Sequence, residues 1–76
     1  MTKRIKKAFG VALRDTRKKR KLSQLEVSST SGIDRAYVSE IENGEKNPSI
    51  VTLVRLADAM EVSPVEIVKR MAEELE

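Results

Sequence analysis

Apolar residues recur along the chain at spacings of three and four, with charged and polar residues between them. That spacing places apolar side chains on one face of a helix, and no segment alternates with the period of two that a half-buried strand requires. The pattern therefore predicts an all-α fold of five short helices, at about 3–20, 23–32, 34–42, 49–60 and 64–75.

The same spacing predicts which side chains point inward. They are Ile5, Phe9, Ala12, Leu13 and Thr16 in the first helix, Val38 and Ile41 in the third, Ile50, Leu53, Leu56, Ala57 and Met60 in the fourth, and Val65, Val68, Met71 and Leu75, with Ile67 alongside, in the fifth. A chain of 76 residues with these faces forms one compact domain, 1–76, with a small core.

Start signals support two of these helices. Ser23 and Glu26 have the spacing of a capping box, in which each side chain bonds a backbone N–H of the other residue. Ser63 and Glu66 repeat that spacing, and Pro64 suits a first helical position, where no N–H is needed.

The segment from Ser31 to Ser49 contains the signal that points to function. Gly32 lies where the turn needs a positive φ, and Asp34 is a favourable N-cap for the helix that follows. Asn43 and Gly44 both tolerate the left-handed backbone at which a helix ends. Two short helices joined by a tight glycine turn make a helix-turn-helix, whose second helix enters the DNA major groove.

Charge is distributed unevenly along the chain. Residues 1–21 contain ten Lys or Arg and one acid, whereas residues 22–76 contain five Lys or Arg and eleven acids, which together give the net charge of +3. A basic segment of this kind indicates either a polyanion partner or a solvated helix with a charged face.

The composition also excludes several classes of site. The chain has no cysteine and no histidine, so it lacks a thiolate metal site and the commonest general base. We expect no catalysis, no metal and no cofactor. No apolar run approaches the roughly 20 residues of a membrane span, and no signal peptide is recognisable, so a cytoplasmic location without a membrane partner is expected.

The motif core, residues 22–62, resembles the phage-repressor (Cro/repressor) type of helix-turn-helix DNA-binding domain. The residues that carry this resemblance are LSQ, the glycine turn, IENG, a polar loop, PS and LVRLADAMEV. The resemblance implies a lambda-repressor-like fold. The chain is similar, more weakly, to the controller proteins of restriction–modification systems, through its short length and the stretch DRAYVSEIE.

Three residues depart from the family pattern. Leu25 stands where a polar residue is usual, so it is expected to be an exposed apolar residue. Ser28 replaces a small alanine under the turn, and its hydroxyl needs a partner when buried. Lys21 replaces a common glycine between the first two helices, so that turn is expected to differ.

The resemblance implies contact with double-stranded DNA through eight residues. They are Gln24, Arg35, Ala36, Tyr37, Ser39, Glu40, Asn43 and Lys46. Arg35 is suited to the bidentate bond with guanine and Ala36 to a thymine methyl group, whereas Gln24 is expected to hold a phosphate. Four alternatives remain open: Arg35 pairs with Asp34 or Glu40, Glu40 only orients Arg35, Tyr37 only packs, and Gln24 is only an exposed side chain.

The resemblance further implies a salt bridge between Arg17 and Glu42, which would tie the first helix to the end of the recognition helix. Nearby basic residues are expected to neutralise DNA phosphates and release counterions, although they circle the helix and not all can reach DNA. These residues are Arg14, Lys18, Lys19, Arg20 and Lys21.

One such motif reads few base pairs, so a homodimer on a pseudo-palindromic operator is expected. The candidate interface residues, Val51, Val54, Ile67 and Met71, either meet a second copy or complete the core. The predicted function is a transcription regulator that represses by covering a promoter or activates by touching RNA polymerase. The alternative is an antitoxin or adaptor whose main partner is a toxin-like or other protein.

Overall fold

The computed structural model describes residues 2–76 and contains five helices and no strand within that range. The helices are α1 (Thr2–Lys19), α2 (Gln24–Ser31), α3 (Arg35–Glu42), α4 (Ile50–Ala59) and α5 (Pro64–Leu75). The all-α, five-helix prediction is confirmed. Within residues 2–76, no helix is both long enough and apolar enough to cross a membrane.

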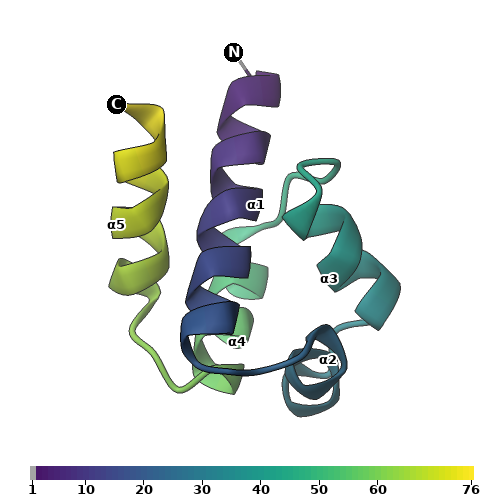
Figure 1. Ribbon diagram of the computed structural model, residues 1–76. Coiled ribbons are helices and arrows are strands. Elements are labelled where there is room, and N and C mark those ends of the chain that lie inside the picture. The colour runs from purple at the N-terminus through teal and green to yellow at the C-terminus, as the bar shows by residue number, and fades with distance from the viewer. Residues whose placement is uncertain (1) are drawn as a thin grey trace.

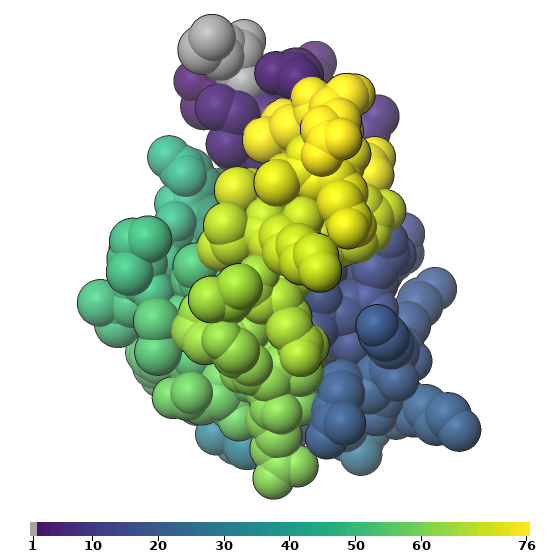
Figure 2. Space-filling view, turned by 90° about the vertical axis from the view of Figure 1, so that its left-hand side faces the viewer, coloured from purple at the N-terminus to yellow at the C-terminus, as the bar shows by residue number. Residues whose placement is uncertain are grey.

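Helix α1 packs mainly against α5 and α3, whereas α2 packs against α3 and α4, and α4 packs against α2 and α5. Helix α5 runs antiparallel beside α1, α2 and α3 lie together on the opposite side, and α4 lies behind α1 (Figure 1). Seen from its outer side, α5 forms a ridge that covers much of α1 (Figure 2). This arrangement leaves the α2–α3 pair protruding from the scaffold that α1, α4 and α5 provide.

Every helix contributes to one apolar core. The buried residues are Ala12 and Leu13 from α1, Val27 from α2, Ile33 from the turn, Val38 and Ile41 from α3, Leu53, Leu56, Ala57 and Met60 from α4 and its C-cap, and Ile67 from α5. Because the core spans all five helices, the position of the α2–α3 pair is fixed by the same contacts that stabilise the fold.

The expected helix starts are largely confirmed. The Ser23–Glu26 capping box is complete, with bonds of 3.0 and 2.8 Å. The hydroxyl of Ser63 accepts from the Val65 N–H at 3.2 Å, and Pro64 is the first residue of α5. The predicted return bond from Glu66 is wrong, because this exposed carboxylate lines a polar groove between α1 and α5 instead.

The predicted inward faces of α4 and α5 need correction. Ile50 is 74% exposed and Val65 is 68% exposed, although both were expected to face inward. Ile67, which is 1% exposed, is the core residue of α5, and Val68 is exposed beside it. Periodicity marks an apolar arc on each helix, but the helices packed against α4 and α5 cover only part of that arc.

Gly10 has a role that the sequence analysis missed. A Cβ atom there would lie 2.6 Å from the backbone oxygen of Ile41 and 2.7 Å from that of Glu42. Such distances are far inside van der Waals contact, so only glycine allows α1 to approach the end of α3 this closely.

Arginine side chains bond carbonyl groups at the C-terminal ends of three helices. Arg55 donates to Ser31 O at 2.9 Å, Arg20 donates to Met60 O at 3.0 Å, and Arg4 donates to Leu75 O. Cations at these ends satisfy free carbonyls and complement the helix dipole. Arg20, expected to contact DNA phosphates, is therefore partly engaged within the fold.

Candidate nucleic-acid interface

The turn between α2 and α3 is fixed by local hydrogen bonds. Gly32 has a φ of 74°, as its expected left-handed conformation requires, and its N–H donates to Ser28 O at 2.9 Å. The Ser28 hydroxyl, expected to need a partner, donates to Ile33 O. The Ile33 N–H in turn donates to the Ser31 hydroxyl at 3.1 Å. The angle between the two helices is therefore held by polar contacts as well as by the core.

The first turn of α3 presents its side chains to solvent. Arg35 and Ala36 are exposed, and within residues 2–76 Arg35 makes no ion pair, so the alternative pairing with Asp34 or Glu40 is absent. The Asp34 carboxylate instead accepts from the Ala36 N–H at 3.4 Å. An exposed guanidinium without a protein partner is free to bond a nucleic-acid base.

Three other candidates on α3 are only partly exposed. Tyr37 packs against the core, which supports its packing role and leaves the hydroxyl as its functional group. Ser39 and Glu40 are half-buried in the middle of the helix. These side chains lie further along α3 than Arg35 does.

The loop after α3 carries the last two candidates, Asn43 and Lys46, and both are exposed. The expected helix end at Asn43 and Gly44 is confirmed: Asn43 is the C-cap of α3, with a φ of −82°, and Gly44 takes the left-handed backbone, with a φ of 76°. A Cβ on Gly44 would lie 3.1 Å from the Cα of Lys7, so the loop lies directly against α1.

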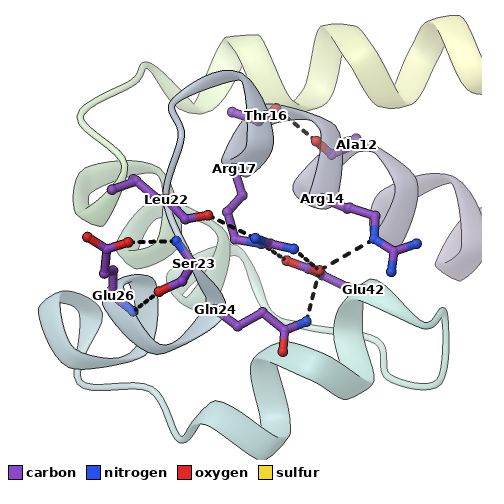
Figure 3. Close-up of polar contacts among 9 residues, drawn as sticks. All are labelled: Ala12, Arg14, Thr16, Arg17, Leu22, Ser23, Gln24, Glu26 and Glu42. Atoms are coloured by element: carbon purple, nitrogen blue, oxygen red, sulfur yellow. Dashed lines mark hydrogen bonds and ion pairs between the residues drawn. The ribbon is translucent and has the colours of Figure 1, made fainter.

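The expected pair between Arg17 and Glu42 is present and belongs to a larger network (Figure 3). Arg17 donates to the two carboxylate oxygens of Glu42 at 2.6 and 2.9 Å, and to Leu22 O at 2.8 Å. The hydrogen bond with Glu42 raises the pKa of Arg17 above its ordinary value, although burial acts in the opposite direction. Both side chains are buried, so the pair is held away from water.

Two further side chains meet the same carboxylate. The Gln24 amide donates to Glu42 Oε1 at 3.0 Å, and Arg14 Nε lies 3.9 Å from that oxygen. The sequence did not link Gln24 or Arg14 to Glu42, because Glu42 lies 18 positions after Gln24 and 28 positions after Arg14, and no local spacing connects residues so far apart. The structure brings α1, the start of α2 and the end of α3 together at Glu42.

The candidate interface residues fall into two groups. Val51 and Val54 are exposed and Met71 is half-buried. Ile67 is a correction, because it is buried in the core of the single chain and is not available to a second copy. Beside them lies an apolar groove of about 320 Å³ between α1, α4 and α5, lined by residues that include Ile5, Phe9, Ile50, Leu53, Val68 and Met71.

The amino-acid sequence of this chain is similar to those of known helix-turn-helix proteins. A family model described as helix-turn-helix matches residues 13–67. An uncharacterised regulator of the helix-turn-helix type, y4dJ of Sinorhizobium fredii, is 39% identical over 64 residues, which are 84% of this chain and 83% of that protein. The immunity repressor of Bacillus phage phi105 is 34% identical over 59 residues, or 78% of this chain and 41% of the longer repressor.

A solved structure gives the same result. The crystal structure of the restriction–modification controller protein C.AhdI from Aeromonas hydrophila is similar to this chain, with a TM-score of 0.78 and 39% sequence identity. The match covers 82% of this chain and 94% of that one. Both expected kinds of relative, a phage repressor and a controller protein, are therefore similar to this chain in sequence, and C.AhdI is also similar to it in fold.

Proposed function

The chain belongs to the helix-turn-helix family, and on that premise we propose that it is a sequence-specific transcription regulator that binds duplex DNA as a homodimer. The observation that carries the proposal is the first turn of α3. Its backbone is capped by Asp34, and Arg35 is exposed and free of ion pairs within residues 2–76. This is the end of the recognition helix that meets base edges in such motifs.

Base reading belongs to the side chains along α3. Arg35 is placed to make two hydrogen bonds to guanine O6 and N7, and Ala36 offers a methyl group for contact with thymine. Ser39 and Glu40 lie further along the helix, where Ser39 bonds a base or a phosphate and Glu40 accepts from the amino group of cytosine.

Phosphate contacts position the protein on the duplex. Gln24 at the start of α2 meets Glu42 at the end of α3, and the loop with Asn43 and Lys46 follows that same end. The Tyr37 hydroxyl is a further donor. Contacts of this kind fix register and orientation but carry no sequence information.

Two copies would read a pseudo-palindromic operator, with half-sites about one helical turn, roughly 34 Å, apart. Exposed valines of α4, Val51 and Val54, together with the half-buried Met71 and the adjacent apolar groove, supply the surface that pairs the copies. A two-fold dimer uses the same surface patch on both copies, so one apolar residue of the sequence is buried in both copies at the same interface.

The regulator acts in the cytoplasm without catalysis and without a cofactor, either by covering a promoter or by touching RNA polymerase. The three relatives described above are named as a transcriptional regulator, an immunity repressor and a controller protein. That comparison favours the regulator over the antitoxin or adaptor alternative.

Selection from a random duplex library at about 150 mM salt tests the proposal. We expect a palindromic consensus, and we expect the Arg35→Ala variant to lose a guanine preference at one position in each half-site. Arg70→Ala, which removes the same charge from α5, is the matched control and should select the wild-type consensus. Weak binding without a consensus would refute the proposal.

A further inference from the structure

Two arginine side chains join α4 to the two ends of α2, the helices that pack together in the lower part of Figure 1. Arg55 of α4 donates to the backbone oxygen of Ser31, the last residue of α2, at 2.9 Å. Arg20, in the turn that precedes α2, donates to the backbone oxygen of Met60, the C-cap of α4, at 3.0 Å. Helix α2 is therefore tied to α4 near both of its ends, in addition to the apolar core between them.

The bond from Arg55 reaches the turn that orients α3. The nitrogen that bonds Ser31, Nη2, lies 3.2 Å from the place that a Cβ on Gly32 would take, so the guanidinium lies over the turn. The Ser31 hydroxyl in turn accepts from the Ile33 N–H at 3.1 Å. A movement of Ser31 relative to α4 would therefore change the angle at which α3 leaves the turn.

The polar contacts of Arg55 are all directed at the end of α2. Within residues 2–76 this exposed side chain makes no ion pair, even with Asp58, the acid that follows it by three positions on α4. Its charge instead lies at the C-terminal end of α2, where it satisfies a free carbonyl group and complements the helix dipole. The bond holds two helices in place and leaves no acidic side chain neutralised.

Helix α4 also carries part of the surface proposed to pair the two copies. Val51 and Val54 are exposed on it, and Arg55 is four positions after Val51, which makes the two side chains neighbours on the helix surface. In a two-fold dimer that pairs through α4, the position of each α3 depends on its connection to α4. The separation of the two recognition helices decides which half-site spacing fits the protein.

We propose that Arg55 and Arg20 are positioning residues, which fix α2 and α3 against α4 and so restrict the dimer to operators of one half-site spacing. This inference rests on the proposed function, because it explains how the two recognition helices of one dimer keep their separation. It requires no contact of either arginine with DNA. Without these bonds each recognition helix still reads its half-site, but the two helices keep their separation less strictly.

The test measures binding to the selected operator and to versions with one base pair inserted or deleted between the half-sites. One base pair moves a half-site by about 3.4 Å and turns it by about 34°. In the wild-type protein we expect either change to weaken binding about a hundredfold, the effect of losing about two base contacts at tenfold each. In Arg55→Met the loss should be about tenfold or less, because α3 can follow the displaced half-site.

Lys69→Met on α5 is the matched control, since it removes one exposed positive charge away from the contacts between α2 and α4. It should keep the hundredfold loss. If Arg55 touched a phosphate, Arg55→Met would lower the slope of log affinity against log salt by about 1.8 for a dimer, or about 0.9 for each contact. The positioning role predicts the same slope for Arg55→Met and Lys69→Met.

Arg20→Met releases the other end of α2 and is an independent second variant. It should relax the spacing requirement in the same direction, and circular dichroism checks that the helices of both variants remain. The spacing loss compares two affinities of one protein, so a smaller folded fraction lowers both affinities alike and leaves their ratio unchanged. The guanine preference set by Arg35 should be kept in both variants.

The outcomes separate the two proposals. If no duplex is selected, the proposed function fails. If an operator is selected but Arg55→Met and Arg20→Met both keep the hundredfold loss, the function stands and the positioning role is wrong. A wild-type protein that binds all three spacings equally would also overturn it, because no separation would then be fixed. A lower salt slope in Arg55→Met than in Lys69→Met would replace positioning by a phosphate contact.

Discussion

Lys21, in the turn between α1 and α2, has a φ of 59°, a left-handed conformation that disfavours any residue with a Cβ. The family pattern has glycine here, and a different turn was expected because of the lysine. The turn instead takes the glycine conformation with a lysine in it. The chain therefore carries local strain at a position where glycine would carry none.

Replacing Lys21 by glycine should raise the free energy of unfolding by about 0.5–1 kcal/mol, because relief of the left-handed strain exceeds the extra entropy of glycine in the unfolded chain. The midpoint of thermal unfolding should rise by about 3–6 °C, as scanning calorimetry would record. Lys21→Ala removes the same charge but keeps the Cβ, so it should give no increase. Equal stabilisation by both variants would show that charge repulsion, not the backbone, is responsible.

The pair between Arg17 and Glu42 should be far more important for stability than the exposed pairs of Arg70. Arg17→Met leaves a buried carboxylate without its two charge-assisted bonds, and should lower the free energy of unfolding by about 2–4 kcal/mol. Urea unfolding measures this loss. Arg70→Met also breaks two ion pairs, but these are solvated, so its urea midpoint should stay close to wild type. Similar midpoints for both variants would contradict the assignment.

Among the helices, the contact between α1 and α3 depends most on one small residue. Gly10 lies where α1 crosses the last turn of α3, with no space for a Cβ beside the carbonyl groups of Ile41 and Glu42. Two turns further along α1, Arg17 reaches the Glu42 carboxylate. The close backbone approach at Gly10 and the buried ion pair thus hold the end of α3, the recognition helix, against α1.

Gly10→Ala should destabilise the protein by about 1–3 kcal/mol, since overpacking against backbone atoms outweighs the gain of about 1 kcal/mol that alanine gives in a helix. Thr30→Ala on the exposed side of α2 is the control for helix propensity. It should stabilise the protein by about 0.5 kcal/mol. Chemical unfolding of both variants checks the prediction, and a stabilised Gly10→Ala would mean that α1 and α3 are not in close contact.

For the molecule as a whole, the apolar surface left over by the core decides how two copies meet. Val54 is 39% exposed on α4, and Val51 is exposed on the same helix. Val51→Glu and Val54→Glu should each weaken self-association at least tenfold, because a buried carboxylate without a partner opposes pairing. Analytical ultracentrifugation would show monomers at concentrations where the wild type is dimeric.

Leu25→Glu is the control for this prediction. Leu25 is an exposed apolar residue, as its departure from the family pattern suggested. It belongs to α2, a helix on the opposite side of α1 from α5 (Figure 1). Its replacement should leave self-association unchanged. If Leu25→Glu dissociates the protein and the valine variants do not, the copies meet through α2.

Particular residues show how far the sequence could be interpreted. The turn and its two helices could be predicted from Gly32, Asp34 and the Ser23–Glu26 pair, because turn and capping interactions join residues no more than four positions apart. Ile50 and Val65 were placed in the core wrongly. The apolar stripe on a helix is wider than the surface that a neighbouring helix covers. Whether a residue at the edge of the stripe is buried depends on the angle at which the two helices pack.

The sequence by itself determined the all-α class, the five helices, the helix-turn-helix and the exposed Arg35, since periodicity, caps and turn residues are local properties. Only the tertiary structure decided that Ile67 is core, that Gly10 must be small, and that Arg14, Arg17 and Gln24 meet at Glu42. Those contacts join residues 18 to 32 positions apart in the chain. Their geometry depends on how helices cross, and no local pattern encodes a crossing.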